Sequence, residues 1–120
     1  MGNFKELKAY KQAFELAMDI FEISKSFPKE EIYSLTNQIR RSSRSVVACI
    51  AEAYRKRQYE AHFISKISDA DMENSETQSW IDFALACNYI LSENYGSLIN
   101  KSESVGRLLN DMIEHPEKYK

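Results

Sequence analysis

Apolar residues recur at alternating spacings of three and four along most of this 120-residue chain. Side chains at these spacings share one face of an α-helix, because the helix turns once every ~3.6 residues. The chain holds only three glycines and two prolines, and it shows no apolar alternation typical of strands. The pattern therefore predicts an all-α protein built from amphipathic helices.

Four segments carry this pattern, and the breaks between them differ in strength. The first ends before Pro28, which pushes the preceding residue out of the helical region. The second begins between Lys29 and Ser34, because Pro28 suits a first helical turn and Ser34 is a competing cap. The second break, Arg57–Tyr59, is placed there because one helix of more than about 55 residues is improbable in a soluble domain. Ser92 is the predicted cap of the last helix. The expected helices span about residues 4–26, 30–56, 60–91 and 93–114.

Short connections between amphipathic helices predict an antiparallel up-down-up-down four-helix bundle, in a single domain over residues 1–120. The first helix is expected to face the core with one main line of apolar residues and a second line beside it. The main line is Leu7, Tyr10, Phe14, Ala17 and Phe21, and the second is Ala13, Ile20 and Phe27. In the third helix, a second line extends the apolar surface to another side, and its residues are Trp80, Phe83, Cys87 and Ile90. We expect the bundle to cover one side of that helix and another subunit to cover the other.

A few residues qualify this picture. Asn74 and Asn88 fall on the apolar line of the third helix, where we favour the edge of the core over a buried role in fixing register. Both cysteines, Cys49 and Cys87, lie in apolar runs and are expected to be buried free thiols. Residues 117–120 are expected to form a frayed tail.

The second expected helix contains a strongly basic stretch, residues 38–57. It holds six of the sixteen lysines and arginines and one acid, whereas the whole chain has a net charge of −2. The overall charge argues against a general nucleic-acid binder, but a local basic face stays possible. The residues of this candidate contact face are Arg40, Arg41, Arg44, Arg55, Lys56 and Arg57.

Acids of the third helix offer a structural explanation for half of these cations. If the two helices run antiparallel about a turn near residue 58, Arg40 and Arg44 lie level with Glu76 and Glu73. Arg–carboxylate pairs suit such partly buried sites between helices. The ion pairs would involve Arg40, Arg41, Arg44, Asp69, Glu73 and Glu76.

The other three cations, Arg55–Arg57, have no such partners. They are either a solvated helix end, which the helix dipole favours, or a patch that binds phosphates. Tyr54 and Tyr59 flank them and could stack on bases, although tyrosines at such positions more often pack.

Patterns of catalysis and metal binding are missing from the sequence. A di-iron bundle needs Glu-x-x-His on two helices, and neither His62 nor His115 has a glutamate three residues before it. Two histidines cannot supply a usual zinc set, and no Cys-x-x-Cys or glycine-rich phosphate loop occurs. We therefore expect no enzyme activity, no metal, no cofactor and no small-molecule substrate.

The apolar runs are too short for a membrane span, so no membrane partner is expected. The first residues lack the apolar core of a signal peptide. The expected location is the cytoplasm.

Residues 27–57 resemble a known family. The resemblance rests on Phe27-Pro28, Gln38-Ile39-Arg40-Arg41 and Ile50-Ala51-Glu52, together with Glu76-Thr77-Gln78 later in the chain. Their spacing is similar to that of the bacterial four-helix bundle proteins encoded in intervening sequences of 23S ribosomal RNA genes. Two stretches depart from the family pattern. Cys49 and Ala53 stand where the family usually has Asn and Gly, and residues 69–72 replace a segment with Gly and Ser.

The resemblance implies a left-handed four-helix bundle that assembles as a homopentamer, without enzyme activity and of unknown function. The fold is similar to the accessory variability determinant of diversity-generating retroelements, a basic pentamer that binds nucleic acid and a reverse transcriptase. Two hypotheses follow. The chain is an oligomeric bundle that binds RNA or an RNA-associated protein through its basic face, or it is a structural or protein-interaction scaffold whose arginines form salt bridges.

Overall fold

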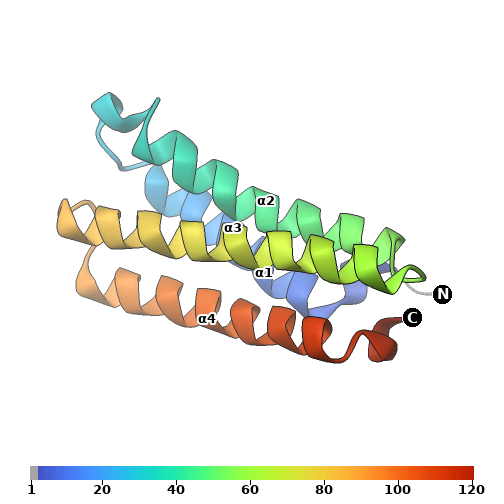
Figure 1. Cartoon of the computed structure of the whole chain (residues 1–120). Coiled ribbons are helices and arrows are strands. Elements are labelled where there is room, and N and C mark those ends of the chain that lie inside the picture. Colours follow the sequence, from blue (N-terminus) through green and yellow to red (C-terminus); the bar gives the residue numbers. More distant parts are fainter. Residues whose placement is uncertain (1–2) are drawn as a thin grey trace.

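Four α-helices make up the computed structural model, which describes residues 3–120, and each helix packs against two neighbours. Successive helices run antiparallel, and both ends of the chain lie at the same end of the bundle (Figure 1). The α-helices are α1 (Lys8–Ser24), α2 (Leu35–Arg55), α3 (Glu60–Ala86) and α4 (Ser92–Glu114). Short 3-10 turns are η1 (Phe4–Glu6), η2 (Lys29–Glu31) and η3 (Pro116–Tyr119). The all-α four-helix prediction is confirmed, and the first two residues of the predicted domain lie outside the described part.

The start of α2 differs from the expected start at residue 30. Residues 29–31 form the separate turn η2, and Ser34 has a non-helical backbone, with φ −127° and ψ −102°. The carboxylate of Glu31 accepts hydrogen bonds from the Leu35 amide (3.2 Å) and the Ser34 hydroxyl (2.6 Å). The side chain of Glu31 therefore takes the capping role at the first free amides of α2.

The end of α3 comes five residues earlier than expected, at Ala86. Asn88 has a φ of +62°, in the left-handed region. The amides of Asn88 and Tyr89 donate to the carbonyls of Leu85 and Ala84, both at 2.9 Å. This pair of hydrogen bonds forms a Schellman motif, in which a residue in the left-handed region ends the helix.

The first and last helices also differ in detail from the expectation. Leu7 has an extended backbone, with ψ 135°, and so separates η1 from α1. Ser92 is the first residue of α4 instead of its cap, and the Asn94 side chain accepts the hydrogen bond of the Leu91 amide at 3.0 Å. The expected frayed tail is wrong as well, since Tyr119 stacks on Phe63 with ring centroids 6.0 Å apart.

The core consists of two apolar clusters separated along the bundle by buried polar groups. One cluster surrounds Ile50 and Phe63, and the other surrounds Ile20 and Ile81. Between them lies a polar layer of five residues. Its members are Ser42 on α2, Asn74, Thr77 and Gln78 on α3, and Ser102 on α4.

Hydrogen bonds within the polar layer satisfy its polar groups, so their burial costs little. Asn74 donates to the Ser102 carbonyl and accepts from the Ser102 hydroxyl, both at 2.9 Å. Thr77 and Ser42 are joined at 2.8 Å, and Gln78 donates to the Ser102 hydroxyl at 2.9 Å. Asn74 is therefore a core residue, against the expectation that it lies at the edge. No helix of the described residues is long and apolar enough to cross a bilayer.

Candidate interaction surfaces

The three arginines in the first half of α2 do not act as a set. The Arg41 guanidinium lies 2.5 Å from Glu76 and 3.3 Å from Glu73. Partial burial by itself would lower the pKa of Arg41, but the hydrogen bonds and charges of the two carboxylates outweigh it and raise that pKa. Arg41 therefore ties α2 to α3.

Arg40 and Arg44 face α1 instead of the acids of α3. Their guanidinium carbons lie 4.9 and 5.6 Å from the centre of the Phe21 ring, and Arg40 also donates to the Ser24 hydroxyl at 2.7 Å. Residues four apart share a helix face, whereas the next residue along is rotated by ~100°. The expected ion pairs of Arg40 and Arg44 are thus not formed within residues 3–120.

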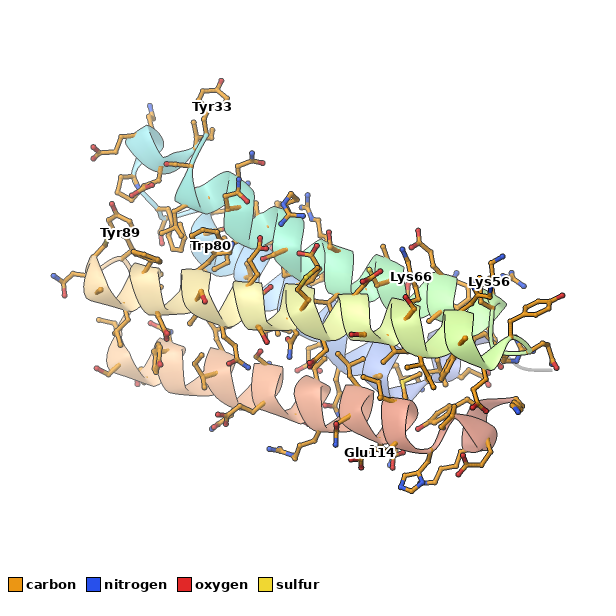
Figure 2. The ribbon with its side chains drawn as sticks, in the orientation of Figure 1. Tyr33, Lys56, Lys66, Trp80, Tyr89 and Glu114 are labelled. Atoms are coloured by element: carbon orange, nitrogen blue, oxygen red, sulfur yellow. The ribbon has the colours of Figure 1, made fainter. Side chains whose placement is uncertain are left out.

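Asp69 also has a different partner from the one expected. Its carboxylate lies 3.9 Å from the ammonium of Lys66, which is held more closely by Glu52 at 2.9 Å. Figure 2 shows Lys66 on α3 beside the later part of α2. Asp69 thus forms no arginine pair in the described part of the chain.

The C-terminal end of α2 carries the remaining cations, Arg55–Arg57, which we name the basic tip. The Arg57 guanidinium lies 4.0 Å from the Tyr54 ring centre and donates to the Tyr54 carbonyl at 2.9 Å. Arg55 and Lys56 are exposed, and neither forms a salt bridge with the residues that the structure describes. Lys56 lies at the same end of the bundle as the chain termini (Figure 2). These charges are accessible to an outside partner.

An apolar groove of about 470 Å³ runs between α1 and α2. We name it the α1/α2 groove, and its lining residues are Phe4, Tyr10, Phe14, Ala17, Met18, Arg44, Val47, Ala48 and Ala51. Phe14 is 49% exposed and Met18 is 45% exposed. The expectation that Phe14 belongs to the main core line of the first helix is therefore wrong, because the line through Ala13 and Leu16 faces inward instead.

A second hollow, of about 420 Å³, lies between the start of α2 and the end of α3. We name it the α2/α3 wedge. Its lining residues are Glu31, Tyr33, Ser34, Leu35, Gln38, Trp80, Phe83 and Cys87. The Trp80 and Phe83 rings lie 5.9 Å apart at 36°, and Phe83 is 55% exposed. The second apolar side expected for the third helix thus opens into this wedge.

Groups that could carry chemistry are dispersed. Within residues 3–120, no three His, Cys, Asp or Glu side chains come close enough to hold a metal ion. Burial raises the pKa of the half-buried Cys49 thiol, against the opposing charge of Lys66, so this thiol is a poor nucleophile at neutral pH. Cys87 is exposed, contrary to the expected burial.

The comparison with protein families decides which family the chain belongs to. A family model described as 23S rRNA-intervening sequence protein matches residues 5–111. The chain belongs to this family. The resemblance seen in the sequence is confirmed, and the departures at Cys49 and Ala53 lie within the matched region.

A solved structure supports the same conclusion. The chain is similar to a crystal structure of a protein of unknown function from the S23 ribosomal protein family of Bacteroides thetaiotaomicron. The two are 32% identical over 88% of this chain and 95% of that chain, with a TM-score of 0.80. No curated protein sequence matches the chain at a significant level. The family description names no catalytic activity.

Proposed function

We propose that this member of the family is a non-catalytic scaffold that associates with copies of itself through the α1/α2 groove. The observation that carries the proposal is the exposure of two large apolar side chains, Phe14 and Met18, beside a groove of about 470 Å³. Contiguous apolar surface rimmed by polar residues is typical of protein–protein contacts.

The groove has the form that a neighbouring helix requires. Ala17, Ala48 and Ala51 line it and leave room for another backbone to approach. Phe14 and Met18 stand beside this floor and can insert between side chains of the neighbour. The number of copies rests on the family resemblance alone, which implies a homopentamer.

Light scattering during gel filtration tests this proposal. The wild type should have about five times the monomer mass. Phe14→Ser with Met18→Ser should shift it to smaller species, because each lost side chain removes roughly 2 kcal/mol of apolar burial per interface. Met72→Ser is the matched control, since Met72 is 59% exposed on α3, outside the groove. A double variant that keeps the full mass would refute the groove as the interface.

A second candidate function is binding of RNA, or of an RNA-associated protein, at the basic tip. The supporting observation is that Arg55 and Lys56 are exposed without an acidic partner in the described residues. Arg40, Arg41 and Arg44 are weaker candidates, because Phe21, Ser24 and the acids of α3 already engage them.

Salt dependence tests RNA binding. The affinity for a single-stranded RNA oligonucleotide should fall with salt, with a slope of about −0.7 per phosphate neutralised. Arg55→Gln with Lys56→Gln should reduce the magnitude of that slope by about 1.4, because two phosphate contacts are lost. Lys25→Gln with Lys29→Gln, at the other end of the bundle, should leave it unchanged. An affinity that does not respond to salt would count against this function.

A further inference from the structure

The basic tip has an exposed aromatic side chain beside its cations. We propose that Tyr59 stacks on an unpaired base of a single RNA strand while Arg55 and Lys56 bind the phosphates of that strand. The inference rests on the proposed RNA binding at the basic tip, and it names the form of RNA that this site takes. It does not involve the α1/α2 groove, because none of these three residues lines it.

The connection between α2 and α3 brings Tyr59 next to the basic tip. The amide of Tyr59 donates to the carbonyl of Lys56 at 2.8 Å, which closes a turn between the two helices. Tyr59 is also the residue directly before α3. Because this turn holds the two backbones together, one short strand can contact the ring and the cations at the same time.

The ring of Tyr59 is open to a planar ligand. Tyr59 is 63% exposed. The ring of His62 stands at 87° to that of Tyr59, with the centroids 6.2 Å apart. Such an edge-to-face contact covers at most one face of the Tyr59 ring, so within the described residues the other face is free to stack on a base.

The other tyrosine beside the basic tip, Tyr54, is not available in this way. Tyr54 is half-buried, and the guanidinium of Arg57 lies 4.0 Å from the centre of its ring. Arg57 also donates to the Tyr54 carbonyl at 2.9 Å, which holds the guanidinium at the ring. Both tyrosines flank cations in the sequence, but the structure separates one that packs from one that is exposed.

The charge around Tyr59 favours phosphates. Residues 53–59 contain three cations and no acid. The two acids that flank this stretch already have partners, in the pairs Glu52–Lys66 at 2.9 Å and Glu60–Lys120 at 3.4 Å. The cations of the basic tip can therefore meet phosphates without a competing carboxylate among the described contacts.

Cations beside an open aromatic ring are typical of sites that bind single-stranded nucleic acid. A base inside a duplex already stacks on its neighbours, so the Tyr59 ring could reach only the end of a duplex. A run of acidic residues in a protein would pair with the cations but has no planar ring for Tyr59. The combination therefore favours an unpaired strand over a duplex or an acidic protein surface.

Titration calorimetry with three probes tests this inference. The probes are an RNA of about ten nucleotides without self-complementarity, the same RNA paired with its complement, and inorganic polyphosphate. Tyr59→Ala should weaken binding of the single strand about tenfold, because the stacking of one base is lost. Binding of the duplex and of polyphosphate should not change, since they use only the cations. The salt dependence of single-strand binding should also stay the same, because no phosphate contact is removed.

Further variants show whether the ring itself is responsible. Tyr59→Phe keeps the ring and should bind the single strand as the wild type does. Tyr59→Leu keeps apolar bulk without a ring and should bind as weakly as Tyr59→Ala. Tyr33→Ala is the matched control, because Tyr33 is 90% exposed and lies at the opposite end of the bundle from Lys56 (Figure 2). It should leave the binding of all three probes unchanged.

Three outcomes would overturn the inference. They are unchanged single-strand binding by Tyr59→Ala, an equal loss of duplex binding in that variant, and tighter binding of polyglutamate than of the single strand. The first two leave RNA binding at the basic tip intact, so they refute the stacking role alone. A wild type without salt-dependent binding to either RNA would instead refute the proposed RNA binding, and this inference with it.

Discussion

At the scale of single residues, Glu31 joins three parts of the chain. Its carboxylate accepts hydrogen bonds from the start of α2 and, at 2.7 Å, from the hydroxyl of Tyr89 in the connection between α3 and α4. The hydrogen bond from Ser34, followed by those from Tyr89 and Leu35, lowers the pKa of Glu31 below its ordinary value of 4.5. The hydrogen bond between Tyr89 and Glu31 also raises the pKa of Tyr89 to about 12. The ionised carboxylate is therefore the form that stabilises the fold.

This linkage predicts a pH-dependent loss of stability in Glu31→Gln. Because the pKa of Glu31 is lower in the folded state, its contribution is complete above 4.5 and is lost as the pH falls through the folded pKa. Thermal unfolding followed by circular dichroism should give the variant a lower Tm than the wild type at neutral pH. The difference should disappear in acid. Glu30→Gln is the control, because the neighbouring Glu30 side chain forms no hydrogen bond within the described residues. A difference in Tm that persists in acid would contradict the prediction.

At the scale of elements, the sequence predicts which segments are helical better than it predicts where each helix faces. The arithmetic of an antiparallel pair gives the height of a residue along the bundle, and Arg41 does lie level with Glu73 and Glu76. It does not give the direction around the helix axis. For this reason the sequence predicts ion pairs of Arg40 and Arg44 with acids of α3, although the face of α2 that carries them points to Phe21 on α1.

A similar limit applies to α1. Two apolar lines run along this helix, and either could face the core by spacing alone. The structure buries the line with the smaller residues, such as Ala9 and Ala13, and leaves Phe14 half exposed. The choice depends on how closely the neighbouring helices approach, which is a property of the packed bundle and not of the segment. The sequence does not reveal the α1/α2 groove, because two adjacent apolar lines are also what a wide core stripe produces, and the spacing assigns the line through Tyr10 and Phe14 to the core.

Helix ends follow the same logic. The end of α3 has a local cause in Asn88, a residue type that tolerates the left-handed region better than most. That signal was present in the sequence but was outweighed by the apolar spacing up to Leu91. The start of α2 depends on the contact of Glu31 with Tyr89, 58 residues later, and no local pattern contains it.

At the scale of the whole molecule, the two ends of the bundle differ in character. The basic tip lies beside the chain termini, and the aromatic α2/α3 wedge lies at the far end of a body 44 Å long. The family match and the sequence together predict the fold class, the helix count and the lack of a catalytic pattern. They do not predict this polarity, because it depends on which cations are already paired inside the bundle.

The polar layer connects α2, α3 and α4 between the two apolar clusters, so it should matter for the stability of the whole bundle. Asn74→Ala removes the partner of both the carbonyl and the hydroxyl of Ser102, which is fully buried. The Ser102 hydroxyl then has no acceptor for its proton, although Gln78 still donates to it. Losing these buried hydrogen bonds costs about 1–3 kcal/mol, so urea unfolding should show a lower midpoint with a similar slope. Asn74→Ala with Ser102→Ala should be less destabilised than the sum of the single variants, because the hydroxyl is then removed together with its partner. Ser104→Ala is the matched control, since the Ser104 hydroxyl bonds the half-buried Gln12 outside this layer. Additive effects of the two single changes would mean that Asn74 and Ser102 act independently.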